Sequence, residues 1–186
     1  ERRQALDFRY TAEQEALRKE FDQFFREEMK SVPPEMDASF EALFEIDACW
    51  EFHKQLGRKL AAKGWLTIAW PREYGGLGAS HMEHVIYREE MAYHMVPGID
   101  MGVGGVNWIG PSLMIYGTDE QKKRHLAGIS RGDVFWCTGY SEPEAGSDMA
   151  TMKCRAVKKG DEYIVNGQKV WTSAAHRANW CWTGVR

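Results

Sequence analysis

A loop of small and polar residues, GYSEPEAGSD at residues 139–148, has the composition of a ligand-binding turn. It contains Pro143, Gly146 and three short polar side chains, Ser141, Ser147 and Asp148. Small residues let a backbone approach a ligand closely, and free N–H groups of such a loop can then face an anion or the polar edge of a ring. The same composition also suits an ordinary surface turn, so the loop alone leaves both interpretations open.

A second segment that could bind a ligand is KVWTS at residues 169–173. Here Trp171 is followed by two hydroxyl side chains, Thr172 and Ser173. An indole can cover a flat aromatic cofactor, and hydroxyl groups can hydrogen-bond to the edge of that cofactor. A core tryptophan with internally satisfied hydroxyls is the alternative.

The chain before the loop is predicted to be helical, because three pairs of residues have the spacing of a capping box. These pairs are Thr11 with Gln14, Ser80 with Glu83, and Thr118 with Gln121. Apolar residues then recur at helical spacing. The first predicted helix runs through Phe21, and the second runs through Leu56 and ends at Gly64. The third begins at Ser80, runs through Met95 and ends at Pro97-Gly98. The fourth covers residues 101–116, with a kink or break at Pro111, and the fifth runs toward Ile129.

The pattern changes to about four short strands from Val134 onward. Asn166-Gly167-Gln168 predicts a hairpin turn between residues 163–165 and 169–171, since Asn-Gly accepts positive φ at both central positions. We therefore expect an α+β fold with a boundary near residue 131: an all-helical domain over residues 1–131, then the start of an antiparallel β-domain over residues 132–186. An open-edged sheet of this size is not a stable design, so we expect a longer polypeptide.

Composition excludes several classes of function. The net charge of -3 and the pI of about 6.1 argue against a nucleic-acid or anionic-membrane binder. No apolar run is long enough for a membrane span, and the N-terminus lacks the apolar core of a signal peptide. The four cysteines include no C-x-x-C pair, which is typical of a reduced, intracellular protein. His81 and His84 share a helix face but lack a third ligand, so no metal site is predicted.

The joint pattern of the two motifs resembles the acyl-CoA dehydrogenase family. That family has [T/S]-E-P-x-A-G-S-D followed by N-G-x-K-x-W-x-[T/S], and this chain has SEPEAGSD at 141–148 and NGQKVWTS at 166–173. The resemblance extends in collinear order over nearly the whole chain. It also includes WPREYGGLG at 70–78, REEMA at 88–92, GTDEQKKRHL at 117–126 and GDEY at 160–163.

The resemblance implies a protein with an N-terminal helical domain, a middle β-domain and a C-terminal helical bundle that is absent from this chain. FAD would lie between the middle and C-terminal domains. The residues that would contact FAD are Thr138, Tyr140, Ser141, Gly146, Ser147, Trp171, Thr172 and Ser173. Ser147 would also touch the acyl-CoA substrate. The family more often has Thr at the positions of Ser141 and Ser173, and serine would keep the hydrogen bond with looser geometry.

The reaction implied by the resemblance is α,β-dehydrogenation of an acyl-CoA thioester. A carboxylate base would take the α-proton while the β-hydrogen moves as hydride to flavin N5. The family's glutamate base usually lies in the C-terminal domain, so no catalytic residue is assigned in this chain, and the 186 residues alone are expected to be inactive. Glu142 is expected to be a structural partner of the loop backbone. Residues 101–114 could line the acyl pocket or be ordinary core.

Two alternatives stay open within this resemblance. The chain could be a non-catalytic flavin-binding or assembly subunit of a heteromeric acyl-CoA dehydrogenase, or it could belong to an acyl-CoA oxidase. The resemblance further implies a homo- or hetero-oligomer that passes electrons to a flavoprotein. We expect it in the bacterial cytoplasm or the mitochondrial matrix rather than as a secreted protein.

Overall fold

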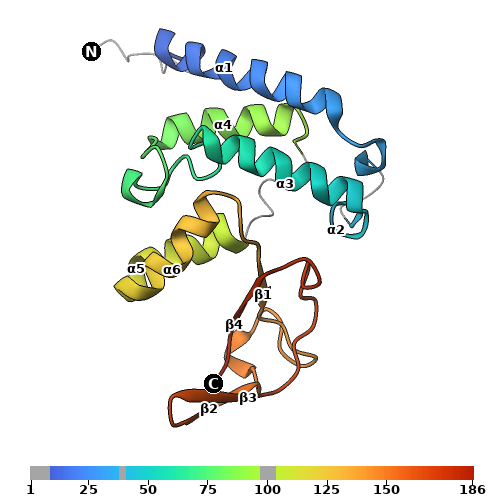
Figure 1. Ribbon diagram of the computed structural model, residues 1–186, viewed down its shortest axis with the longest axis vertical. Helices are drawn as coiled ribbons and strands as arrows, with labels where there is room; N and C mark the ends of the chain where they lie inside the picture. Colours follow the sequence, from blue (N-terminus) through green and yellow to red (C-terminus); the bar gives the residue numbers. More distant parts are fainter. Residues whose placement is uncertain (1–8, 38–40, 97–103) are drawn as a thin grey trace, which may run out of the picture.

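The computed structural model describes residues 9–37, 41–96 and 104–186 (Figure 1). Its principal helices are α1 (Ala12–Glu28), α2 (Ala42–Glu45), α3 (Asp47–Ala62), α4 (His81–Tyr93), α5 (Gly110–Tyr116) and α6 (Asp119–Ser130). A π-helical turn, Gly104–Ile109, precedes α5. The strands are β1 (Trp136–Gly139), β2 (Arg155–Lys159), β3 (Glu162–Asn166) and β4 (Trp180–Thr183). This α+β arrangement, with helices first and strands second, confirms the predicted fold class.

All three predicted capping boxes are present at the starts of α1, α4 and α6. In each box the hydroxyl accepts from the backbone three residues on, and the Glu or Gln side chain accepts from the N-cap backbone. Gly64 follows α3 with a φ of 72°, as expected of a C-terminal glycine. The prediction that α4 reaches Met95 is wrong: it ends at Tyr93, and Met95 has a positive φ of 48°. The predicted stop at Pro97-Gly98 lies outside the described residues.

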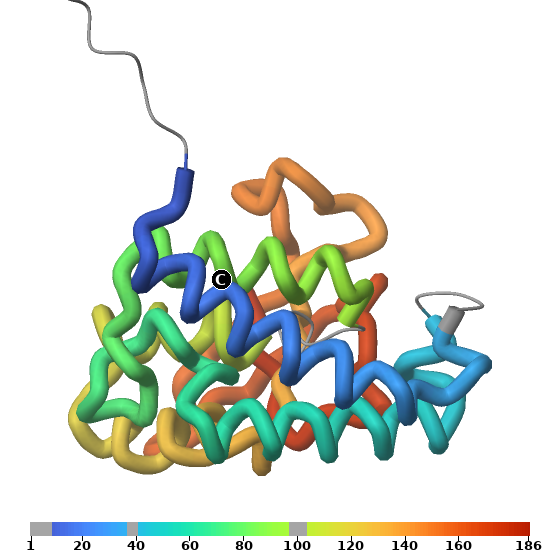
Figure 2. Tube along the Cα trace, turned by 90° about the horizontal axis from the view of Figure 1, so that it is seen from above, coloured from blue at the N-terminus to red at the C-terminus, as the bar shows by residue number. Residues whose placement is uncertain are grey.

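The core of the helical part lies where α1 packs over α3 and α4 (Figures 1 and 2). Phe21, on α1, is fully buried at its centre, with edge-on ring contacts to Trp65 at 4.7 Å and Tyr87 at 5.2 Å. The rest of this cluster is Phe25, Phe52, Leu56, Leu60, Ile68, Ile86 and Met91. Such burial of aromatic and aliphatic side chains from α1, α3, α4 and the segment after α3 stabilises the packing of these helices.

A second core joins α5 and α6 to β1, and its glycines explain the composition of residues 104–110. A Cβ on Gly110 would lie 2.1 Å from the Trp70 ring, and one on Gly104 would lie 2.7 Å from the carbonyl oxygen of Trp136. These glycines permit close packing, so this stretch serves as core at those positions. No interruption occurs at Pro111: the π-helical turn passes directly into α5, and the proline stands in the first turn of α5, where it is tolerated. Residues 101–103 lie outside the described residues.

The strands form two separate pairs. β1 and β4 are parallel, with Trp136 opposite Trp180, whereas the sequence analysis predicted antiparallel pairing. β2 and β3 form an antiparallel hairpin. Its turn is Gly160-Asp161, where Gly160 has a φ of 63° at the first central position, as type II′ turns favour.

The predicted hairpin at Asn166-Gly167 is therefore wrong. Residues 169–171 form no strand, and Val170 instead donates its N–H to the Ser141 carbonyl oxygen at 2.9 Å. Gly167 lies directly against Cys154, where a Cβ would approach the sulfur to 2.6 Å. The Asn-Gly pair thus marks a close crossing of two segments rather than a reversal of the chain.

None of the described helices combines the length and the apolar character needed to cross a bilayer.

Candidate functional site

The buried carboxylate of Glu142 joins three segments of the β-region. Its Oε2 accepts from the backbone N–H of Lys153 at 2.6 Å, and its Oε1 accepts from the backbone N–H of Cys154 at 2.9 Å. Lys169 completes the set, with Nζ 2.8 Å from Oε1. Glu142 was expected to bind the loop backbone; it does bind backbone N–H groups, but those beyond the loop. The hydrogen bond from Lys169, followed by that from the Lys153 backbone, lowers the pKa of Glu142 to about 2.

Lys169 links the loop to the tryptophan segment, a role that the sequence analysis missed. Its Nζ also donates to the carbonyl oxygen of Tyr140 at 3.0 Å, and its side chain is mostly buried. The next residue, Val170, bonds to Ser141. The signal that could have identified Lys169 was present, since a lysine occupies a fixed position between Asn-Gly and Trp in NGQKVWTS. We call the set Glu142, Lys169 and the N–H groups of Lys153 and Cys154 the carboxylate clamp.

The loop beyond the clamp is tight at its base and open at its tip. The Glu142 N–H donates to the Ala145 carbonyl oxygen at 2.8 Å, and the Ala145 N–H donates back at 3.1 Å. Gly146 and Ser147 are exposed, and a Cβ on Gly146 would meet no heavy atom within 4 Å. Backbone that is anchored on one side and open on the other can admit an anionic group such as a phosphate.

Trp171 presents an almost fully exposed indole next to the clamp. The residue is 89% exposed and has a φ of 57°, in the left-handed region that large side chains rarely adopt. Thr172 is half-buried and Ser173 is exposed. An apolar ring system displayed at a strained backbone position is suited to pack on a flat partner.

The predicted site residues therefore fall on two neighbouring stretches. Thr138 is half-buried on β1, opposite Trp182, and Tyr140 and Ser141 follow it. Hydrogen bonds from Lys169 and Val170 bring Tyr140 and Ser141 next to the segment that carries Trp171 to Ser173. Within the described residues no hydrogen bond joins Gly146 or Ser147 to Trp171, so a ligand that these residues share stays a prediction.

The histidine pair on α4 is separate from the group of potential metal ligands that the described residues form. In the part of the chain that the structure describes, His81 and His84 gather no third ligand. Burial, aided by Arg88, lowers the pKa of His84, which disfavours the protonated imidazole. A different group, Asp22, Glu90 and His94, does converge between α1 and α4, and the sequence analysis did not identify it.

Family models cover almost the whole chain. A model described as acyl-CoA dehydrogenase, N-terminal domain, matches residues 11–133, and one described as acyl-CoA dehydrogenase, middle domain, matches residues 137–186. Among curated proteins, acyl-CoA dehydrogenase FadE26 of Mycobacterium tuberculosis is 40% identical over 95% of this chain, which corresponds to 43% of that protein. The chain thus spans less than half the length of the curated relatives it matches.

Solved structures also include chains that are similar to this one over almost its whole length. The ChsE4-ChsE5 complex from Mycobacterium tuberculosis includes a chain that is 39% identical to this one, with a TM-score of 0.80 over 97% of this chain and 44% of that one. A protein described as the Tcur3481-Tcur3483 steroid ACAD is 35% identical, with a TM-score of 0.81 over 97% of this chain and 45% of that one.

Proposed function

The chain belongs to the acyl-CoA dehydrogenase family, and we propose that it supplies the flavin-facing side of the active site in an FAD-dependent acyl-CoA dehydrogenase. The observation that carries the proposal is the carboxylate clamp. It holds the SEPEAGSD loop beside the segment that displays Trp171. The two motifs that the family resemblance links are thus physical neighbours in this chain.

The residues present fit a bound FAD. We propose that the exposed indole of Trp171 packs on one face of the isoalloxazine ring, with Thr172 and Ser173 at its polar edge. Thr138, Tyr140 and Ser141 would line the neighbouring side. The open tip at Gly146 and Ser147 would meet the phosphates, and Ser147 would also touch the acyl-CoA.

The chemistry of FAD, when bound, would be to accept the β-hydrogen of an acyl-CoA thioester as hydride. The part of this chain is to bind and orient. Lys169 and Glu142 set the spacing between the loop and Trp171, and the hydroxyls of Ser141 and Thr172 can donate to polar edges of a ligand. We assign the proton-abstracting base to no residue of this chain, and we expect no turnover from these 186 residues alone.

A second proposal concerns assembly, because two similar solved structures carry two protein names each. We propose a hetero-oligomer in which this chain and a second member of the family complete one site. Light scattering of the protein expressed alone, and with a family member from the same genome, tests this. FAD bound only in the mixed species supports the proposal, while a homo-oligomer that retains FAD and turns over contradicts it.

The cellular location and the redox partner are further proposals, which we infer from membership of the family. We propose the bacterial cytoplasm or the mitochondrial matrix, in keeping with four free cysteines, and an electron-accepting flavoprotein as the redox partner. We also propose that the domain boundary lies near residue 131, between the last helix at Ser130 and the first strand at Trp136.

The decisive experiment is the visible spectrum of the full-length protein. We expect a flavin band near ~450 nm that bleaches when an acyl-CoA is added anaerobically. The panel should run from short linear to polycyclic acyl groups, because one similar structure is described as a steroid ACAD. A protein that stays colourless even with added FAD would overturn the proposal.

The Trp171→Ala variant tests the indole. We expect weaker FAD retention in a desalting assay, because the variant removes the exposed ring next to the clamp. Trp108→Ala is the matched control, since Trp108 is also exposed, at 51%, but lies on the π-helical turn. Equal FAD retention by both variants would remove Trp171 from the site.

A further inference from the structure

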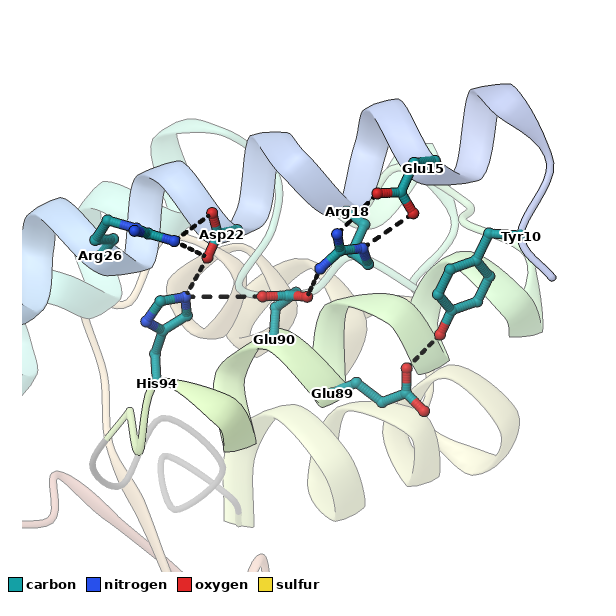
Figure 3. A network of polar contacts seen from close by, with 8 residues as sticks. All are labelled: Tyr10, Glu15, Arg18, Asp22, Arg26, Glu89, Glu90 and His94. Carbon is teal, nitrogen blue, oxygen red and sulfur yellow. Dashed lines mark hydrogen bonds and ion pairs between the residues drawn. The ribbon is translucent and has the colours of Figure 1, made fainter. Parts of the chain in front are cut away.

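Three potential metal ligands meet between α1 and α4, far along the chain from the flavin-facing segments. Asp22 comes from α1, Glu90 from α4, and His94 from the C-cap of α4 (Figure 3). The His94 Nε2 lies 2.9 Å from Asp22 Oδ1 and 3.7 Å from Glu90 Oε2. The three ligand atoms all lie within 4.8 Å of one another.

One ligand atom in this cluster is buried and makes no hydrogen bond, although it lies within ion-pair distance of His94. The Glu90 side chain is 7% exposed, and its Oε2 has no hydrogen-bond partner, although it points toward His94 (Figure 3). Its other oxygen, Oε1, accepts from Arg18 at 3.0 Å. A buried carboxylate oxygen without a partner costs free energy, so it indicates a group that the polypeptide itself does not supply.

The spacing suits a small divalent cation. A Zn²⁺ ion about 2.0–2.1 Å from each of three ligand atoms holds those atoms roughly 3.3 Å apart in tetrahedral geometry. The distances of 2.9 Å and 3.7 Å from His94 Nε2 lie on either side of that value. A donor set of one imidazole and two carboxylates favours transition-metal ions over Mg²⁺, which prefers oxygen ligands alone.

We propose that Asp22, Glu90 and His94 bind a divalent transition-metal ion, with Zn²⁺ as the test case, which ties α1 to the end of α4. Water would complete the coordination. Because a carboxylate can only accept, the 2.9 Å contact to Asp22 places a proton on His94 Nε2 when the metal is absent. Metal binding at Nε2 requires that proton to leave this nitrogen, either for the solvent or for Nδ1 of the same ring.

Two arginines pair with the same carboxylates that would bind the ion. Removing a competing arginine should therefore tighten metal binding. Arg26 holds both oxygens of Asp22 at 2.9 Å, but its side chain is 66% exposed and free to move outward. Arg18 is drawn away by Glu15 at 2.7 Å and engages only Oε1 of Glu90, which leaves Oε2 open (Figure 3). The cluster therefore has a ligand face that the arginines do not fill.

The test is calorimetric titration of the full-length protein with Zn²⁺, and separately with Mg²⁺, at pH 7.5. We expect one Zn²⁺ bound per chain, at least tenfold weaker binding in Glu90→Gln and in His94→Gln, and no heat from Mg²⁺. Zn²⁺ should also raise the melting temperature of the wild-type protein. Far-UV circular dichroism of each variant shows that the helices are intact.

Matched controls separate this site from adventitious binding to surface groups. Glu89→Gln removes the neighbouring carboxylate, which accepts from the Tyr10 hydroxyl instead, and His81→Gln removes an exposed histidine at the start of the same helix. Both should bind Zn²⁺ as the wild type does. Absence of Zn²⁺ binding, or binding that Glu90→Gln leaves unchanged, would overturn the proposal and leave an ion-pair network.

Arg26→Gln gives a second, independent readout. The variant removes the cation that competes for Asp22, so we expect Zn²⁺ to bind at least threefold tighter. Unchanged or weaker binding would contradict the placement of the ion on Asp22. Since the site lies in the helical part, none of these outcomes depends on whether FAD binds at Trp171.

Discussion

The helical part and the β-region of this chain are held together in different ways. Between α1, α3 and α4 a large apolar cluster is buried, together with the Glu90 carboxylate that pairs with Arg18, and Phe21 touches aromatic rings from two other segments. In the β-region the hairpin of β2 and β3 leaves Val157, Tyr163 and Val165 more than half exposed. The buried carboxylate of Glu142 joins the loop, residues 153–154 and Lys169 in this region.

The difference shows where precision is needed. An apolar core is non-directional and tolerates small shifts, so it suits a scaffold. Hydrogen bonds to a charged group fix distances and angles, so they suit a pair of segments that must stay in register beneath a ligand. We therefore expect substitutions in the first region to change folding, and those in the second to change ligand binding.

The largest expected effect is that of Phe21→Ala. The variant empties the centre of the helical core, and large-to-small changes of this kind cost about 3–5 kcal/mol. Urea unfolding followed by far-UV circular dichroism measures the loss. A cost below about 1 kcal/mol would show that the helical part does not depend on this core, and the comparison with the β-region would fail.

The next effect is that of Glu142→Gln, which should reduce FAD affinity by roughly tenfold or more while the helical signal stays unchanged. The amide cannot pair with Lys169 as a charge, and one of its ends is a donor that faces other donors. Flavin fluorescence during titration measures the affinity. Glu144→Gln is the control, because that carboxylate is exposed and pairs with the side chain of Lys153, and it should alter the affinity less than about twofold.

Lowering the pH should have a smaller effect on FAD retention. Lys169 and the backbone donors lower the pKa of Glu142 from 4.5 to about 2, so the clamp favours the ionised, folded form. Its contribution is complete above about pH 4.5 and is lost as the pH falls toward 2. We expect FAD release in this interval to be less steep in Glu142→Gln than in the wild type. Identical profiles would separate the clamp from FAD retention.

The smallest effect is expected for Thr118→Ala, at about 1 kcal/mol, because the change removes one side of the capping box of α6. Thermal unfolding of the protein measures it. Flavin binding should be unchanged, since α6 belongs to the helical part. Weaker FAD binding in this variant would mean that the two regions are coupled more tightly than their separate modes of stabilisation indicate.

Features that depend on neighbouring residues could be predicted from the sequence, and those that depend on distant residues could not. The capping boxes involve residues three apart, so their letters alone identify them. The turn at Gly160-Asp161 was missed because Asn166-Gly167 carries the stronger local signal, and only the contact of Gly167 with Cys154 overrides it. Tertiary contacts decide between turns of similar propensity.

The candidate site follows the same rule. The family motifs identified the loop and Trp171, but they did not show that Lys169 reaches back to Tyr140 and Glu142, across 29 and 27 residues. The contacts of Arg18 with Glu90 and of Asp22 with His94 each span 72 residues, and no spacing rule on a single helix identifies them. Such pairs require the packing of α1 on α4 to be known first.

The parallel pairing of β1 with β4 has a consequence for biosynthesis. Trp136 pairs with Trp180, so the loop, the hairpin and Trp171 all lie within one long chain closure. At ~5–20 residues per second, β1 leaves the ribosome roughly two to nine seconds before its partner strand exists. During that interval the helices can already pack, while β1 has no β4 strand to pair with. The segments proposed to bind the flavin therefore lie inside a closure that can form only after β4 has been synthesised.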